Sequence, residues 1–229
     1  MYRERPAAGL ACVWVHVTDG PARILPDACS DLIWREGVGA WLAGPDTTAA
    51  VADLPPGTVL VGARFAPGAG GPALRRSLES VRDQRLALPG LGVDPGLEPA
   101  EALRRLTTAA QRMALENPPD RAVLEAARRL RADPRARVPV LADDLVLSER
   151  QLRRRCLVAA GHAPKVLQRV LRLQRVVRAI DAGEDDLARL AADHGYADQA
   201  HLTSESTALA GLSPAALVRC RSSPAAPAG

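Results

Sequence analysis

The sequence predicts an α+β protein, in which a small antiparallel β-rich domain precedes an all-α domain of two helix-turn-helix units. Two patterns along the chain carry this prediction. Short apolar and β-branched runs separated by Gly, Pro and Asp fill residues 1–66, which is typical of strands and turns. From residue 73 onward, apolar residues recur every three or four positions, which is the spacing of amphipathic helices.

The predicted β-rich domain covers residues 1–90 and is interpreted as a sensor or regulatory domain. Its strands are expected at 10–17, 32–34, 40–43 and 58–65. Several short strands joined by turns favour a small sheet or partial barrel. The Gly/Pro segment 67–73 has neither GK[ST] nor a GxGxxG at a strand-to-helix junction, so we expect a plain loop there. A short helix should follow at 74–81.

Residues 91–120 form a predicted helical connector between the two domains. Its helix at 101–115 has one apolar side, which is a candidate contact with a second copy of the chain. The Pro-Pro pair at 118–119 ends that helix. The all-α domain then begins, at 121–221, with a helix whose N-cap is Asp120.

The first helix-turn-helix unit is predicted around Ser148. A short helix at 140–145 precedes the turn, and Ser148 with Gln151 three residues later fits a capping box. Gly161 should end the second helix. Two short helices around a tight turn, the second presenting arginines, are typical of a helix-turn-helix unit. The outward arginines are Arg150, Arg153 and Arg154.

A long helix at 164–181 bridges to a second unit at 184–221. Asp185 or Asp186 should cap its first helix, and Asp198 its second. The turn between them contains a glycine that can take a positive φ. The tail at 222–229, SSPAAPAG in sequence, is expected to be disordered.

Positive charge gathers in the helical half of the chain. Residues 148–180 carry nine basic residues and one acidic residue, a local net charge of +8 in a chain whose net charge is +4. Residues 1–120 have a net charge of −2, and residues 121–229 have +6. A basic half joined to a near-neutral half indicates a polyanion-binding module attached to another domain.

Composition excludes several classes of protein. Hydrophobic residues make up 47% of the chain and charged residues 24%, which is typical of a globular protein. No apolar run approaches the length of a membrane span, and the charged start does not resemble a signal peptide. The four cysteines show no CxxC spacing. We therefore expect a cytoplasmic protein with reduced thiols, no membrane contact and no cofactor.

Two segments carry a resemblance to a known family. LSERQLRRRCLVAAGHAPKVLQRVLRLQR resembles the first half of the AraC/XylS-type DNA-binding domain, and LARLAADHGYADQAHLTSESTALAGLSPAALVR resembles the second. The resemblance covers about residues 121–221. The pieces ILPDACSDLIW, LAGPDT, GARFAPGAG and VRDQRLAL are similar to the small domain that precedes it in one bacterial subgroup.

The resemblance implies a bacterial transcriptional regulator that binds double-stranded DNA. Recognition helices at about 148–158 and 198–209 would enter successive major grooves. Arginine can pair with guanine, and glutamine with adenine, through two hydrogen bonds at once. Phosphate contacts would set the register. The residues that the resemblance places at DNA are Arg150, Arg153 and Arg154 in the first groove, Gln199, His201, Thr203 and Ser204 in the second, and Lys165 and Arg169 at phosphates. RNA polymerase is a further candidate partner.

The sequence departs from the family pattern in three places. Val146 stands where the first turn usually has Gly, and Cys156 stands where an aromatic residue usually packs. In the second recognition helix the family usually has basic residues and a Phe, where this chain reads Ser204, Ser206, Thr207 and Ala208. We hypothesise that the first unit supplies most of the affinity for DNA.

An enzyme is not expected, although two groups of polar residues were weighed as metal or catalytic sites. The first group matches no metal spacing, and Asp after Pro is common in turns. The second group is divided between the two units, so helix caps and surface positions are expected instead of a zinc site. The first group is Asp27, Asp31 and Asp46 with His16; the second is His162, His194 and His201 with Cys156.

The alternative function is a ligand-sensing or protein-interaction module with weakened DNA binding. An unknown small-molecule effector would then lie against the N-terminal sheet, with Trp14, Trp34, Trp41 and Phe65 lining the site. Core packing is the competing use of these four side chains. Salt separates the two functions, because only a DNA-binding protein releases phosphate counterions and loses affinity steeply as salt rises.

Overall fold

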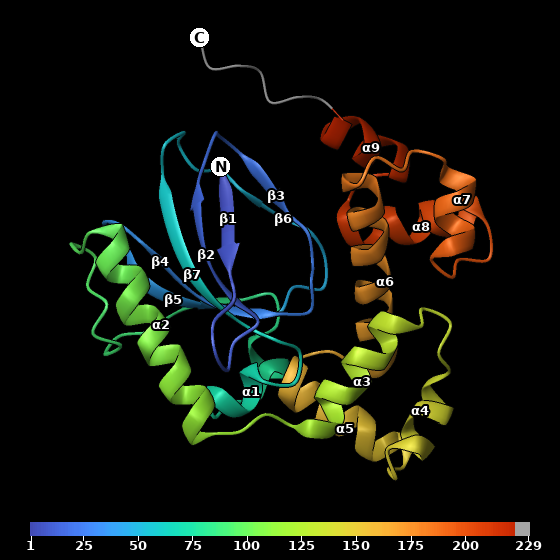
Figure 1. Cartoon of the computed structure of the whole chain (residues 1–229), viewed down its shortest axis with the longest axis horizontal. Helices are drawn as coiled ribbons and strands as arrows, with labels where there is room; N and C mark the ends of the chain where they lie inside the picture. Colours follow the sequence, from blue (N-terminus) through green and yellow to red (C-terminus); the bar gives the residue numbers. More distant parts are fainter. Residues whose placement is uncertain (223–229) are drawn as a thin grey trace.

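A six-stranded antiparallel sheet forms the N-terminal part of the protein, in the order β1-β2-β7-β4-β5-β8 (Figure 1). The structure is a computed structural model and describes residues 1–222. The four expected strands are confirmed as β2, β4, β5 and β7. The edge strands β1 and β8 were not expected, because YRER and RLA are too short and too polar to show a strand pattern. The strands are β1 Tyr2–Arg5, β2 Cys12–Val17, β4 Ser30–Arg35, β5 Gly39–Ala43, β7 Val59–Phe65 and β8 Arg85–Ala87.

Helix α2 (Pro99–Glu116) covers one face of this sheet (Figure 1). Leu103 and Leu106 belong to the same apolar cluster as Trp34 and Phe65. The helix expected at 101–115 is confirmed. Its apolar side is occupied by the sheet, so that side offers no surface for pairing with a second copy. The domain boundaries drawn from the sequence stay predictions, but α2 packs with the β-rich part.

The opposite face of the sheet carries the other two tryptophans. Trp14 lies opposite Gly62, Gly62 opposite Ile33, and Ile33 opposite Trp41. Residues that face one another across strands point to the same side of a sheet. The alternative in which all four aromatic residues line one ligand site is therefore wrong for Trp34 and Phe65. Both are fully buried in the core under α2, which is the competing use expected for them.

A two-stranded ribbon stands over this second face. It consists of β3 (Ala22–Ile24) paired with β6 (Ala50–Ala52). In Figure 1 the ribbon lies between the sheet and α6. Neither strand was expected, because three residues are too few to show alternation. The ribbon and its flanking loops also reach the helices, because the Ala49 backbone N–H and Arg23 hydrogen-bond to carbonyl oxygens near the end of α8.

The segment 67–81 differs from the expected loop and helix. Gly70–Ala73 form a short helix, α1, and only Leu78–Val81 (η1) of the segment expected to be helical form a turn of 3-10 helix. A Cβ on Gly71 would lie 2.4 Å from the carbonyl oxygen of Val158. Glycine is required there because α1 approaches the backbone of α5 closely. The Gly/Pro composition thus serves a contact between the two parts of the chain.

The helical region follows the predicted order. Asp120, Ser148, Asp186 and Asp198 accept hydrogen bonds from backbone N–H groups at the starts of their helices, which confirms these N-caps. The tail expected to be disordered lies, apart from Ser222, outside the described residues. The helices are α3 Arg121–Ala132, α4 Val138–Asp144, α5 Glu149–Ala160, α6 Pro164–Asp181, α7 Leu187–Asp193, α8 Gln199–Ala210 and α9 Pro214–Ser222.

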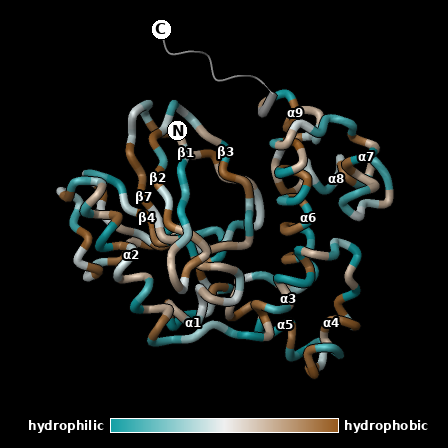
Figure 2. The backbone as a smooth tube through the Cα atoms, in the orientation of Figure 1, coloured by the Kyte–Doolittle hydropathy of each residue, from teal (hydrophilic) through white to brown (hydrophobic). Residues whose placement is uncertain are grey.

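Helix α6 is the axis of this region. Val170, Leu171 and Leu173 are fully buried in it. Helices α3 and α5 pack against it from the first unit, and α8 and α9 from the second. Hydrophobic segments recur along α6 in Figure 2. Because both units pack on one straight element, the spacing between their recognition helices is fixed by the core.

Val146 lies in the turn between α4 and α5 with a φ of 55°. Glycine adopts a positive φ freely, which accounts for the glycine that the family usually has at this position. A β-branched residue is strained in this conformation, by roughly 1 kcal/mol. We predict that Val146→Gly raises the free energy of unfolding in urea by up to roughly 1 kcal/mol, since the freedom of glycine in the unfolded chain offsets part of the gain.

The matched control for this prediction is Val140→Gly. Val140 is also an exposed valine, but it lies inside α4. Glycine in a helix lowers stability by about 1 kcal/mol, so the two substitutions should move the urea midpoint in opposite directions. Equal destabilisation by both would contradict the strain at Val146.

Candidate DNA-binding surface and ligand cavity

Helix α5 holds three arginines on one exposed side. The capping box fixes its start: Ser148 Oγ accepts from the Gln151 backbone N–H, and Gln151 Oε1 accepts from the Ser148 backbone N–H. Leu152 and Cys156 are fully buried and orient the helix. Within residues 1–222, no ion pair or hydrogen bond engages the guanidinium groups on the outer side. These belong to Arg150, Arg153 and Arg154, and all three residues are exposed.

The fourth arginine of α5 has a structural partner. Arg155 donates from Nε and Nη2 to the two carboxylate oxygens of Asp120, each at 2.8 Å. Asp120 Oδ1 also accepts from the first-turn backbone N–H groups of α3. This ion pair ties α5 to the start of α3. It also separates Arg155 from the three arginines that remain open to a partner.

Glu205 of α8 forms ion pairs with two arginines of α6. Arg169 Nε lies 2.8 Å from Glu205 Oε1, and Arg172 Nη1 lies 3.8 Å from Glu205 Oε2. Arg172 is buried and lies 5.2 Å from the ring centroid of Tyr196. A phosphate contact by Arg169 would have to compete with this ion pair. Lys165, by contrast, is exposed at the start of α6.

The polar residues of α8 are partly engaged within the helix. Gln199 and Ser204 are exposed. Thr203 Oγ1 donates to the Gln199 carbonyl oxygen at 2.8 Å. His201 Nδ1 accepts from the Ala197 backbone N–H, and its Nε2 lies 3.7 Å from Glu205 Oε1. Two of the four side chains expected at DNA therefore already have intramolecular partners.

Two of the departures inside the recognition helices, Ser206 and Cys156, are core positions. Ser206 is fully buried, and its Oγ donates to the Leu212 carbonyl oxygen at 2.8 Å. Cys156 is fully buried, and burial raises the pKa of its thiol to about 12. A small side chain with an internal partner thus replaces an aromatic anchor. The thiol of Cys156 stays protonated and unreactive at neutral pH.

The two units share one groove of about 1060 Å³ between α5 and α8. Expected DNA contacts from both units line it, which places them on one surface. Arg135 and Arg137, from the loop before α4, line the same groove and were not expected; the basic run RADPRAR was the signal for them. Within the described part of the chain, Glu149 and Glu205 are the acidic residues that line it. The expected contacts in its walls are Arg150, Arg153, Lys165, Arg169 and His201.

A second hollow lies between the sheet and the β3–β6 ribbon, with a volume of about 560 Å³. Trp14, Trp41 and Leu60 line it from the sheet, and Ile24 and Leu54 line it on or near the ribbon. A Cβ on residue 62 would lie 2.2 Å from the Trp14 ring, so only glycine permits the indole to lie against the strand. Volume and apolar walls are those of a small-molecule site. We call this hollow the sheet cavity.

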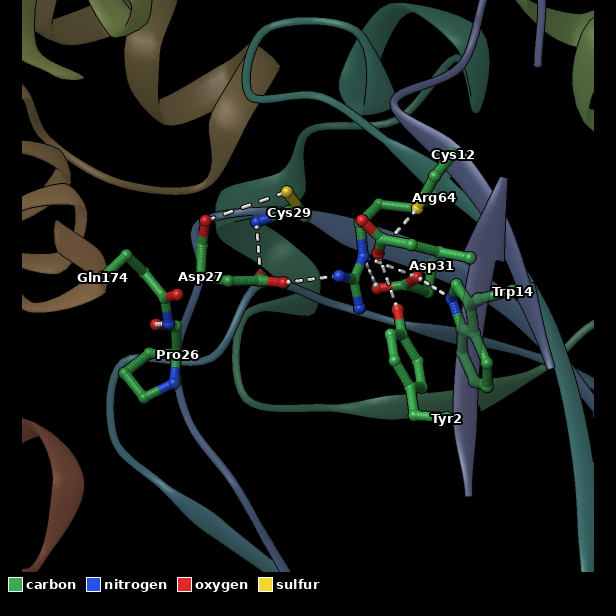
Figure 3. A network of polar contacts seen from close by, with 10 residues as sticks. Tyr2, Cys12, Trp14, Pro26, Asp27, Cys29, Asp31, Arg64 and Gln174 are labelled. Atoms are coloured by element: carbon green, nitrogen blue, oxygen red, sulfur yellow. Dashed lines mark hydrogen bonds and ion pairs between the residues drawn. The ribbon is translucent and has the colours of Figure 1, made fainter. Parts of the chain in front are cut away.

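A charged network forms one end of the sheet cavity (Figure 3). Arg64 Nε lies 3.0 Å from Asp31 Oδ1, and Arg64 Nη1 lies 3.2 Å from Asp27 Oδ2. Trp14 Nε1 donates to Asp31 Oδ1 at 2.7 Å. Burial raises the pKa of Asp31, and the charge of Asp27 adds to this. The turn role expected for Asp27 is also present, since its Oδ1 accepts from the Cys29 backbone N–H.

The ribbon and its flanking loops contact the DNA-binding part directly. The Ala49 backbone N–H donates to the Leu209 carbonyl oxygen at 2.7 Å, and Arg23 Nη1 donates to the Ala210 carbonyl oxygen at 3.2 Å. Both carbonyls belong to the last turn of α8. Gln174 of α6 donates to the Pro26 carbonyl oxygen, one residue from Asp27 (Figure 3). One wall of the sheet cavity is thus bonded to a recognition helix.

The remaining histidines are not arranged as a site. His162 is fully buried, so the expectation of a cap or surface position is wrong for it. Asp46 pairs with Arg85 at 2.6 Å.

Within residues 1–222, no three His, Cys, Asp or Glu side chains gather so that they would hold a metal ion. Among the helices of the same residues, none combines the length and apolar character needed to cross a bilayer.

The paired units, the basic groove and the exposed arginines define a DNA-binding protein of the helix-turn-helix class. Comparison with protein families agrees. A family described as a helix-turn-helix domain matches residues 141–219, and a domain of unknown function (DUF6597) matches residues 7–87. Residues 141–219 therefore carry a helix-turn-helix domain of the AraC type, in agreement with the resemblance seen in the sequence. No curated protein matches the sequence.

Solved structures of similar fold are those of ToxT from Vibrio cholerae. ToxT of strain O395 has 10% identity and a TM-score of 0.53, covering 97% of this chain and 99% of that chain. An apo variant from strain SCE256 has 11% identity and a TM-score of 0.54, covering 91% and 96%. ToxT bound to (E)-4-(8-methylnaphthalen-1-yl)but-3-enoic acid has 9% identity and a TM-score of 0.52, covering 96% and 99%. At such low identities the likeness, measured by the TM-scores, is one of fold alone.

Proposed function

We propose that this regulator, which acts by binding rather than by catalysis, reads successive major grooves with α5 and α8 and draws most of its affinity from α5. The observation that carries the proposal is the set of unpaired arginines on the outer side of α5. A guanidinium without an internal partner loses no ion pair when it binds a base or phosphate. The proposed contacts of the first unit are Arg150, Arg153, Arg154 and Lys165.

The second unit is proposed to orient the protein on DNA more than to add affinity for DNA. Glu205 places a negative charge in the shared groove and occupies Arg169 and Arg172. Gln199 and Ser204 remain exposed for base contacts, and Gln199 can pair with adenine. His201 and Thr203 would have to exchange their internal partners to reach DNA. Arg169 is therefore proposed to hold α8 against α6 through Glu205 instead of contacting a phosphate.

The experiment that tests this function is an anisotropy titration on the DNA upstream of the protein's own gene. It is run at about 50 and 200 mM salt with a scrambled duplex as control. Each neutralised phosphate contributes roughly one unit to the slope of log affinity against log salt. We expect sequence-selective binding with a slope of a few units. Binding that is independent of salt and of sequence would contradict the proposal.

A second activity, sensing of a small molecule, is favoured by the sheet cavity. Its volume lies within the range of small-molecule sites, and one of its walls is bonded to the last turn of α8. A molecule that fills the cavity would bear on the ribbon and so on the position of α8. The similar ToxT fold binds a naphthyl-substituted carboxylic acid, which is compatible with an apolar effector in this chain.

A further inference from the structure

The sheet cavity has three distinct zones, which follow from strand register. The first cross-strand row contains Arg64 and Asp31, and the third contains His16, Leu60 and Arg35. Along β4, Asp31 and Arg35 are four residues apart, about 13 Å in an extended strand. The middle row places Trp14 and Trp41 between them. A ligand in this cavity would therefore lie beside aromatic side chains, with a charged zone at either end.

Negative charge is in excess at the Asp31 end. A single guanidinium, Arg64, serves both Asp27 and Asp31. Glu4 is close by, accepting from the Tyr2 hydroxyl at 3.1 Å and the Cys12 thiol at 3.6 Å. The neighbouring Asp46 is balanced by Arg85 through two hydrogen bonds. Asp27 and Asp31, which line this end of the cavity, thus share one cation, and Glu4 adds a third carboxylate beside Tyr2 and Cys12.

Burial makes this imbalance significant. The Asp31 side chain is 10% exposed, and it already accepts from Trp14 and Arg64. Charges of one sign in a partly dry site repel each other more strongly than in water. A positive group that arrives with a ligand would relieve this repulsion. Aromatic faces beside it would attract the same positive charge.

We propose that the sheet cavity binds an organic cation, with its flat apolar body between Trp14 and Trp41 and its positive group at Asp27 and Asp31. The inference rests on the proposed sensing function and names the ligand class. The other end of the cavity holds Arg35, for which no ion-pair partner occurs within residues 1–222. An anionic ligand would choose that end, and the test distinguishes the two.

The test compares two compounds that share one ring system and differ in charge, 1-naphthylmethylamine and 1-naphthoic acid. Calorimetric titration of the full chain at neutral pH should show the amine binding at least about tenfold more tightly. Asp27→Asn should weaken the amine by about tenfold, because Arg64 is then balanced by Asp31 alone. Glu4→Gln should weaken it less. Thermal melting verifies that both variants are folded.

Arg35→Gln is the matched control, since it removes a charge of the opposite sign from the same cavity. It should not weaken amine binding, because the charge that it removes repels a cation. Tighter binding of the acid, lost in Arg35→Gln, would overturn the cation and leave sensing intact. Binding of neither compound would also overturn the proposal of a cationic ligand. The DNA-binding function is tested separately, by the anisotropy titration without ligand. Amine binding that leaves DNA affinity unchanged would support the ligand class and contradict the sensing function.

Discussion

Replacing Arg153 and Arg154 together by alanine is expected to weaken specific DNA binding by about a hundredfold. Each contact of an arginine with a base or phosphate contributes roughly 1–3 kcal/mol, and about 2.8 kcal/mol corresponds to a hundredfold change in Kd. Both side chains are exposed and have no internal partner within residues 1–222, so the folded protein loses no ion pair. The slope of log affinity against log salt should also fall by roughly one for each lost phosphate contact.

The matched control removes the same two charges from another helix. Arg104 and Arg105 lie exposed on α2 and pair only with Glu101 and nearby backbone. Arg104→Ala/Arg105→Ala changes the net charge equally, so it should alter DNA affinity by only a few-fold. This comparison separates a local contact from a general effect of charge.

A second double variant tests the asymmetry between the units. Gln199→Ala/His201→Ala should cost about tenfold or less, because α8 offers fewer unpaired donors than α5. The opposite ranking, with affinity intact in Arg153→Ala/Arg154→Ala and abolished in the α8 variant, would overturn the proposal. Circular dichroism should confirm that both proteins retain their helices.

The helical half was predictable because its signals are local. A cap such as Ser148 or Asp198 and the helix that it starts lie within four residues of each other, and the apolar spacing of α6 repeats inside one element. Even the strain at Val146 could be read from one position of a turn. The second recognition helix was located correctly for the same reason, although its exposed residues carry little charge.

A ligand site lined by Trp14 and Trp41 was proposed from the sequence as the alternative function, but its ribbon wall and the charge pairs were not, because their partners are distant in sequence. Arg64 and Asp31 are separated by 33 residues, and Arg169 and Glu205 by 36. From the sequence, Arg169 was one member of a basic run, and only the packing of α8 on α6 assigns it to Glu205. The ribbon strands are too short to show a pattern, so the wall that they form over Trp14 and Trp41 could not be predicted from the sequence.

His162 is a polar side chain with no partner in the place where the two parts of the chain meet. It is fully buried, and neither ring nitrogen has a hydrogen-bond partner within the described residues. A Cβ on its neighbour Gly161 would lie 2.4 Å from Pro45 Cγ and 3.1 Å from the Leu78 carbonyl oxygen, and the Gly161 carbonyl accepts from Arg82. Burial lowers the pKa of His162 to about 4, with the charge of Arg82 contributing and Asp83 and Asp27 opposing.

This lowered pKa makes the protein sensitive to mild acid. The unfolded chain takes up a proton at its ordinary value near 6.5, and the folded chain only near 4, so falling pH favours unfolding through this window. The full effect is about 3 kcal/mol. We predict that His162→Leu, an apolar side chain of similar size, removes most of the loss of unfolding free energy between pH 6.5 and 4 while changing stability at pH 8 by less than about 1.5 kcal/mol. Urea titrations of both proteins across this range would measure it. Parallel stability curves would contradict the assignment, because the acid sensitivity would then come from carboxylates such as those paired with Arg64 and not from the buried imidazole.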